Sequence, residues 1–388
     1  MTDDNRISQF SAWFLPLILI SKVVRYTIMR AQLVNMSIGW GMLGRMLSGR
    51  HASFMVSSFG EMSNASSVVT NNAEWMFHNL SFGLVEKIFG GDIFTCYVAF
   101  EVLITIIFNF LIFRTAVMFL EEHPHISDGE MLFILLNVAV LNIFCFNLAK
   151  EPYQLLFFFL MAWAIKRGED FRSKSALLIG ALVLTVLLAR KYYAMIIMYY
   201  VVLCLLLPGF FINGESDSQS RKGMSIGRIV LLFVLFGVFH YFLLSTLSDG
   251  AEDTYEELVA ANTRMGKANS QILPLFGRGN KVLLSVDYFI KVFRLLFPVE
   301  ILIKGNITYF IAVFYQFLLW GILIKAFKRR GSDNATQTVA LYLYIAFLLC
   351  SAAFEPDFGS WMRHQGVAFP VILLMIGGSK EELGKEEQ

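Results

Sequence analysis

The feature that most constrains this chain is a series of apolar runs, each close to the length of a membrane-spanning helix. The hydrocarbon core of a bilayer is about 30 Å thick, and a helix needs roughly 20 apolar residues to cross it. Ten runs approach that length, near residues 10–29, 95–117, 131–149, 153–165, 176–189, 192–212, 228–247, 307–326, 338–354 and 366–378. We therefore predict an all-α, polytopic integral membrane protein with about ten transmembrane helices, some of them short or re-entrant.

The composition of the chain favours the same fold class. Of its 388 residues, 56% are hydrophobic and only 16% are charged, whereas a soluble domain carries about 25% charged residues. The sequence has no basic stripe, no glycine-rich phosphate loop and no zinc-type spacing of cysteine and histidine. We therefore expect no nucleic-acid partner, no metal and no cofactor, and we interpret the four cysteines as small buried apolar residues.

The distribution of lysine and arginine predicts the orientation of the spans. Basic residues collect in the short loops after the fourth, sixth and eighth runs, and such loops face the cytoplasm. This pattern places both termini in the cytoplasm. The expected parts are a single polytopic domain over residues 1–388, long extracytoplasmic loops at 30–94 and 248–306, and a charged cytoplasmic tail at 379–388.

Two segments depart from this pattern. Lys22, Arg25 and Arg30 crowd the outer half of the first run, which conflicts with the orientation and leaves the limits of that run open. Residues 281–303 carry Asp287, Lys291 and Arg294 at helical spacing among apolar residues. That spacing is typical of an amphipathic segment that lies at the membrane surface or re-enters it.

The sequence AKEPYQ, residues 149–154, separates the third and fourth runs. The run after Pro152 spans only about 20 Å as a helix, so the turn would lie below the outer membrane surface. Lys150 is therefore a candidate substrate-binding residue and Glu151 a candidate catalytic residue. The alternative is an ordinary helix end whose lysine reaches out to water.

The sequence ARKYY repeats this geometry after the fifth run. Arg190 and Lys191 interrupt a long apolar stretch, and ionisable groups at membrane depth usually face a cavity or a partner. Arginine forms forked hydrogen bonds to phosphate oxygens, so both residues are candidates for binding an anionic substrate. Here too, the alternative is that both cations extend to the surface.

The third polar turn is EPDFGSWMRHQ, before the last run. Arg363 and His364 are its candidate substrate-binding residues. Pro356 biases Glu355 away from helical backbone. In the alternative interpretation, Arg363 simply pairs with Glu355 or Asp357 within the turn.

A carboxylate in the first outer loop could act as a general base if it reaches a substrate hydroxyl. Glu74 is the candidate, because Trp75 and His78 lie close to it in the sequence and such groups line sugar sites. The alternative is an exposed acid on an amphipathic helix.

Together these motifs resemble those of bacterial O-antigen and capsule repeat-unit polymerases and related integral-membrane C-type glycosyltransferases. The matching features are the polar pair before Pro152, the arginine after the fifth run, the FP pair at 297–298, and the acidic turn that ends in Arg363. The resemblance covers roughly residues 70–376. It implies that Lys150, Glu151, Arg190 and Arg363 surround a glycan-lipid site, whereas the family's first-loop aspartate is represented only by Glu74.

The function implied by this resemblance is glycosyl transfer or polymerisation of polyprenyl-pyrophosphate-linked saccharides. The reaction would take place on the outer face of the bacterial inner membrane during surface polysaccharide synthesis. The expected partners are the lipid-linked saccharide, membrane lipid and other polysaccharide-assembly proteins. The alternative is a transporter or flippase, which would bind the same lipid-linked saccharide without forming a bond.

Overall fold

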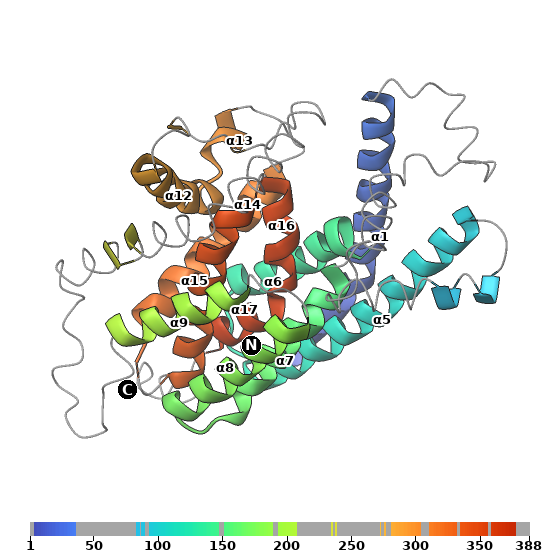
Figure 1. Cartoon of the computed structure of the whole chain (residues 1–388). Coiled ribbons are helices and arrows are strands. Elements are labelled where there is room, and N and C mark those ends of the chain that lie inside the picture. The colour runs from blue at the N-terminus through green and yellow to red at the C-terminus, as the bar shows by residue number, and fades with distance from the viewer. Residues whose placement is uncertain are drawn as a thin grey trace. The chain divides into compact units, whose positions relative to one another are not determined.

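The structure, a computed structural model of the chain, is helical throughout the residues that it describes (Figure 1). These residues are 4–35, 83–85, 87–89, 93–146, 151–188, 193–207, 234–235, 237–238, 272, 275–276, 281–303, 310–331, 334–355 and 358–377. The principal helices are α1 (Asp4–Asn35), α5 (Ile93–Glu122), α6 (Asp128–Val140), the π-helix η2 (Leu141–Cys145), α7 (Glu151–Arg167), α8 (Phe171–Leu188), α9 (Ala194–Leu206), α12 (Lys281–Leu296), α13 (Val299–Ile303), α14 (Phe310–Lys328), α15 (Ala335–Phe354), α16 (Phe358–Val367) and α17 (Phe369–Ile376).

Several of these helices are long and apolar enough to cross a membrane. Within the described residues there are six, at Asn5–Arg25, Ala99–Glu122, Asp128–Cys145, Phe171–Leu188, Phe310–Lys328 and Ala335–Ala352. Each overlaps one of the predicted apolar runs. They indicate an all-helical, multi-pass membrane protein, in agreement with the prediction. The predicted tail at 379–388 lies outside the described residues, as do much of the loops at 30–94 and 248–306 and most of the run at 228–247.

The two runs that were predicted to be short form longer helices. α7 has 17 residues, and it begins at Glu151 rather than after Pro152. α8 has 18 residues, because the polar sequence FRSK forms its first turn. Pro152 lies in the first turn of α7, where a missing N–H has no helical partner to lose.

The chain divides into two compact units, and each is described by itself. Unit 1 comprises Met1–Leu160, Leu184–Arg190 and Arg363–Leu373. Unit 2 comprises Met161–Val183, Lys191–Met362 and Leu374–Gln388. Therefore α1, α5, α6 and η2 belong to unit 1, and α9, α12, α13, α14 and α15 belong to unit 2.

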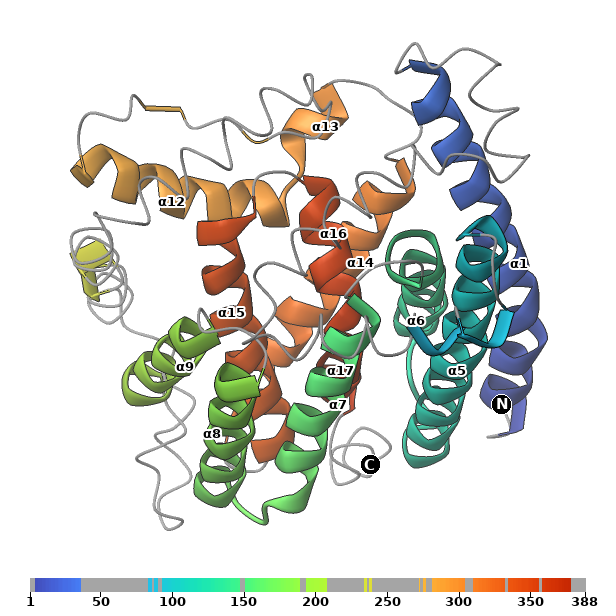
Figure 2. The ribbon, with the colours of Figure 1, turned by 45° about the vertical axis from the view of Figure 1, so that its right-hand side comes forward.

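In unit 1, α1 runs parallel to α6 and η2. At one end, Nη1 of Arg6 lies 2.6 Å from the carboxylate of Asp128, at the start of α6. At the other end, Nη1 of Arg25 donates to the carbonyl of Ile143 in η2 (3.0 Å). The order of these contacts along both helices fixes their common direction, and Figure 2 shows α1, α5 and α6 side by side.

α5 runs antiparallel to α1. Near the start of α5, Glu101 lies 3.2 Å from Nε of Arg25. Further along α5, the ring of Phe113 stacks on Phe10, with 5.8 Å between ring centroids. The first three apolar helices therefore alternate in direction, as consecutive membrane spans do.

Local sequence sets the start of α6, and a tertiary contact holds its end. Ser127 and Glu130 form a capping box, in which each side chain accepts a hydrogen bond from the backbone N–H of the other. In η2, the buried amide of Asn142 exchanges two hydrogen bonds with that of Asn109 on α5, at 2.8 and 2.9 Å. Both amides thus keep partners in an apolar interior, where an unpaired amide would be costly.

α15 is the most buried of the six apolar helices, and unit 2 packs around it. It contacts α9, α12 and α14. The hydroxyl of Tyr288 on α12 donates to the carbonyl of Leu349 on α15, and it lies 3.0 Å from the hydroxyl of Tyr199 on α9. The hydroxyls of Tyr200 and Ser175 form a second buried pair at 2.7 Å. Neutral hydroxyls therefore join several helices of this unit.

The segment predicted to be amphipathic forms α12, which lies across the end of α15 (Figure 2). Its polar face is turned inward. Asp287 and Lys291 are buried, and the carboxylate of Asp287 accepts the backbone N–H of Leu275 at 2.9 Å. Val286 and Phe293 on the opposite face are exposed.

The connection between α7 and α8 is a tight polar turn in unit 2. Nζ of Lys174 donates to the carbonyls of Ile165 and Gly168, and so caps the end of α7. A Cβ on Gly168 would lie 2.4 Å from the backbone nitrogen of Lys174, so only glycine fits there. At the start of α8, the carboxylate of Asp170 accepts the N–H of Ser173. Lys174, one of the basic residues that follow the fourth apolar run, is therefore a buried helix cap.

Candidate functional site

Residues 358–367, predicted to begin as a polar turn, form the helix α16. Glu355 has extended backbone, with φ −81° and ψ 116°, as expected for a residue that precedes proline. Arg363 and His364 therefore project from a helix rather than from a loop. A helix holds their backbone in one geometry, which suits residues that must present charge in a fixed direction.

The end of α16 is held against α6 and η2 by contacts that the sequence explains locally. Pro370 has no N–H, so it cannot donate to the carbonyl of Gly366, four residues earlier. The buried side-chain amide of Asn137 donates to that carbonyl instead, at 3.4 Å. A Cβ on Gly366 would approach Cγ1 of Val140 to 3.1 Å, so glycine lets the two helices pack closely.

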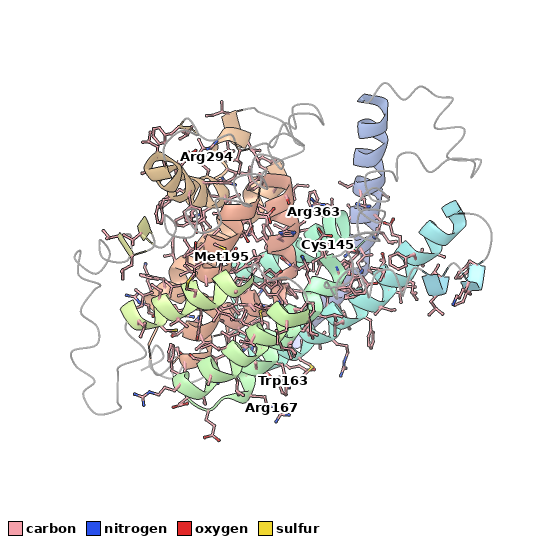
Figure 3. The ribbon with its side chains drawn as sticks, viewed as in Figure 1. Cys145, Trp163, Arg167, Met195, Arg294 and Arg363 are labelled. Carbon is pink, nitrogen blue, oxygen red and sulfur yellow. The ribbon has the colours of Figure 1, made fainter. Side chains whose placement is uncertain are left out.

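Cys145 makes a second link between these helices. Its thiol, at the end of η2, donates to the carbonyl of Arg363 at 3.3 Å, and Figure 3 shows the two residues close together. Asn137 and Cys145 together fix the register of α16 on α6 and η2. This register decides which side chains meet the residues that follow η2.

Glu151, at the start of α7, lies beside both candidate residues of α16. Its Oε1 is 3.8 Å from Nη1 of Arg363 and 3.9 Å from Nε2 of His364. The Glu151 side chain is 3% exposed, that of His364 13%, and that of Arg363 37%. A buried carboxylate is thus covered by one cation that remains open to solvent and by one imidazole.

The distances from Glu151 to Arg363 and to His364 are longer than those of direct hydrogen bonds. A direct hydrogen bond between a cationic nitrogen and a carboxylate is about 2.7–2.9 Å long. Both contacts of Glu151 are longer, so the group is an ion pair without a tight fork. The position of Glu151 in the first turn of α7 also favours its charge, because the N-terminal end of a helix carries a partial positive charge.

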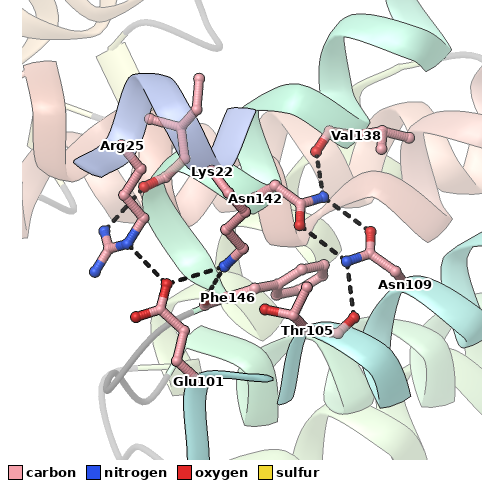
Figure 4. Close-up of polar contacts among 9 residues, drawn as sticks. Lys22, Arg25, Glu101, Thr105, Asn109, Val138, Asn142 and Phe146 are labelled. Atoms are coloured by element: carbon pink, nitrogen blue, oxygen red, sulfur yellow. Dashed lines mark hydrogen bonds and ion pairs between the residues drawn. The ribbon is translucent and has the colours of Figure 1, made fainter. Parts of the chain in front are cut away.

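Lys22 and Arg25 on α1 form a second charged group in unit 1, together with Glu101 on α5 (Figure 4). Oε1 of Glu101 lies 3.1 Å from Nζ of Lys22 and 3.2 Å from Nε of Arg25. Both cations also bind carbonyls at the end of η2, Lys22 that of Phe146 (2.6 Å) and Arg25 that of Ile143 (3.0 Å). Two of the three cations that crowd the outer half of the first run are therefore paired inside the bundle.

Sequence reasoning did not assign this second group to the site. A signal was present, because Lys22 and Arg25 interrupt the first apolar run and Glu101 interrupts the second. Opposite charges isolated in two neighbouring apolar helices are expected to pair. Because α1 and α5 are far apart in the sequence, the pairing of Lys22 and Arg25 with Glu101 was not predicted.

Both charged groups are linked to the end of η2. Lys22 and Arg25 bind carbonyls there, and Cys145 donates to the backbone carbonyl of Arg363. The end of η2 is therefore the common point of the cluster, which holds three permanent cations and two carboxylates, with His364 as a further basic group.

The other candidate residues cannot be compared with this geometry. Glu74, Lys150, Arg190 and Lys191 lie outside the described residues. Over the part of the chain that the structure describes, no three His, Cys, Asp or Glu side chains are grouped to hold a metal ion.

Comparisons of this chain with protein-family models, with curated proteins and with solved structures find no match.

Proposed function

We propose that this protein transfers or polymerises saccharides carried on a polyprenyl diphosphate, at the outer face of the bacterial inner membrane. The observation that carries the proposal is the buried carboxylate of Glu151 beside Arg363 and His364, inside a bundle of apolar helices. This group combines a proton acceptor with a cation that suits diphosphate. The resemblance of the surrounding motifs to polysaccharide polymerases supports the same chemistry.

The proposed topology has about ten spans, both termini in the cytoplasm and two long extracytoplasmic loops. It is supported by the alternating directions of α1, α5 and α6 in unit 1. In that topology the end of α6–η2 that carries Cys145 faces outward. Glu151, Arg363, Lys22 and Arg25 then all lie at the outer end of the bundle, where a flipped lipid-linked saccharide would be available.

In the proposed reaction, Arg363 binds oxygens of the donor diphosphate. Glu151 takes the proton from an acceptor hydroxyl, whose oxygen forms the new bond to the anomeric carbon of the donor. The bond from that carbon to the diphosphate breaks, and the leaving diphosphate keeps the electron pair. Arg363 and His364 stabilise the charge that develops on it, an effect worth about 10²–10³ in rate for one well-placed donor.

The remaining candidates keep their predicted roles in this scheme. Lys150, Arg190 and Lys191 would extend the cationic surface for diphosphate, and Glu74 is a second candidate base in the first outer loop. The lipid tail would lie among the apolar spans.

The test is extension of a lipid-linked glycan by the purified full-length protein in lipid nanodiscs. Polyprenyl-diphosphate-linked repeat units are supplied, and glycan length is read by mass spectrometry. We expect longer products with the unaltered protein and about 10²-fold slower extension with Arg363→Ala. Arg6→Ala is the matched control, because its ion pair with Asp128 lies at the other end of α1 and its carboxylate partner is exposed.

Two results would overturn the proposal. One is extension by Arg363→Ala at the rate of the control. The other is the absence of longer glycans together with movement of a fluorescent lipid-linked saccharide across proteoliposomes, which would identify a transporter instead.

A further inference from the structure

The Lys22–Arg25–Glu101 group has an excess of positive charge. Two cations share a single carboxylate oxygen, Oε1 of Glu101. The three side chains are between 16% and 23% exposed, so they are largely removed from solvent but can still be reached. Within the part of the chain that the structure describes, one positive charge of this group has no carboxylate partner. Such a charge is expensive in an apolar bundle, and an anionic ligand would offset that cost.

Both cations also have N–H donors that the described hydrogen bonds do not use. Lys22 has three N–H donors, and the described contacts use two of them, on Glu101 and on Phe146. Arg25 has five, and the described contacts use two of them, on Glu101 and on Ile143. The remaining donors belong to partly exposed side chains whose position is already fixed by the end of η2, which is the arrangement expected of a preorganised anion site.

The position of this group connects it to the proposed reaction. Lys22 and Arg25 bind the last carbonyls of η2, and Cys145 of η2 is in contact with Arg363. The cations of α1 and the backbone of Arg363 on α16 are therefore both bound at the end of η2. A single phosphate would need only one of these groups, whereas a diphosphate presents two charged groups.

We infer that Lys22 and Arg25 form a second anion-binding subsite, which takes one phosphate of a diphosphate while Arg363 takes the other. Glu101 orients both cations and limits their net charge. The identity of the ligand as a lipid-linked diphosphate rests on the proposed function, but the anion site itself does not. α1 is therefore part of the binding site as well as a membrane span.

The test uses inorganic pyrophosphate and the full-length protein in detergent, with binding measured by calorimetry and folding by the apparent melting temperature. We expect Lys22→Met and Arg25→Met each to weaken binding about tenfold, the loss of one charge-assisted contact. Arg6→Met, on the same helix, is expected to bind like the unaltered protein. Lys22→Arg is expected to retain most of the affinity.

Glu101→Gln separates binding from a purely structural role. Removing the only carboxylate of the group raises its positive charge, so pyrophosphate should bind several-fold more tightly. A structural role alone predicts a lower melting temperature and no gain in affinity. This variant also decides the question if the methionine variants fail to fold.

The outcomes distinguish this inference from the proposed function. If the Lys22→Met and Arg25→Met proteins fold and bind pyrophosphate with unchanged affinity, the subsite is refuted. That result would not contradict the proposed glycan extension. No pyrophosphate binding by the unaltered protein would refute it as well. Binding that depends on Lys22 and Arg25 in a protein that never extends glycans would uphold the subsite and remove the proposed reaction.

Discussion

The two units keep polar groups in their apolar interiors in different ways. In unit 1, charged side chains meet across helices that are distant in sequence, as Glu151 meets Arg363 and Glu101 meets Lys22. In unit 2, neutral hydroxyls meet, as Tyr288 meets Tyr199, and the buried charges of Asp287 and Lys174 bind backbone groups. Burial raises the pKa of Tyr288 well above its usual value, so this hydroxyl stays neutral.

This difference indicates which unit is better suited to ligand binding or reaction. A hydroxyl network satisfies its own donors and acceptors and specifies how helices pack. Buried charges are a weak source of stability, because their desolvation offsets their attraction. Charges that pair with one another across helices of an apolar bundle are therefore better explained by a ligand or a reaction, which supports the site proposed in unit 1.

The sharpest test of the comparison is Glu151→Gln in unit 1. The amide keeps the shape of the side chain but cannot take a proton, so glycan extension should fall about 10²–10⁴-fold. The apparent melting temperature should change much less than the rate, because glutamine keeps the volume of the side chain and one acceptor oxygen. A variant that unfolds but keeps its rate per folded molecule would show that the charges of unit 1 are structural.

A smaller effect, on stability and not on the rate of glycan extension, is expected for Tyr288→Phe in unit 2. A hydroxyl has one proton, and Tyr288 gives it to the carbonyl of Leu349, so Tyr199 donates to Tyr288. Phenylalanine leaves both partners short of a hydrogen bond, at a cost of about 1–2 kcal/mol in the free energy of unfolding.

For Tyr288→Phe, thermal unfolding in detergent measures the loss of stability, and glycan extension should be unchanged. Phe289→Leu, one position along α12, is the control for a change of side chain without loss of a hydroxyl. Extension that fails in a stable Tyr288→Phe protein would move the functional site toward unit 2.

The smallest effect is expected for replacing Asp170, an exposed carboxylate at the start of α8. Hydrogen bonds from Ser173 lower the pKa of Asp170 below its unfolded value of about 3.9. Its contribution to stability is therefore present above that pH and is lost as the pH falls through the lowered pKa.

Asp170→Asn should accordingly lower the apparent melting temperature by about 2 °C or less near pH 6. The difference between the variant and the unaltered protein should shrink as the pH falls below about 3.9. Melting curves from pH 6 downward measure it, and a difference that does not shrink below that pH would show that the carboxylate charge is not what stabilises the turn.

Much of the local structure follows from the sequence. The apolar runs predict the six long helices, since a backbone in an apolar setting must satisfy its own hydrogen bonds. Ser127 and Glu130 have the spacing of a capping box, and Pro356 predicts the extended backbone of Glu355. Glu151, Arg363 and His364 could be selected as candidates because each is a polar residue in a short break between apolar runs.

The sequence by itself thus determined the six long apolar helices that the structure describes and three polar residues of the candidate site, because these depend on neighbours within a few positions. Only the tertiary structure decided which charged side chains pair with one another. It brought Glu151 to Arg363, and it paired Lys22 with Glu101. The physical reason is that charges in an apolar bundle must find each other through space, and the register that joins them depends on distant packing contacts such as that of Gly366 with Val140.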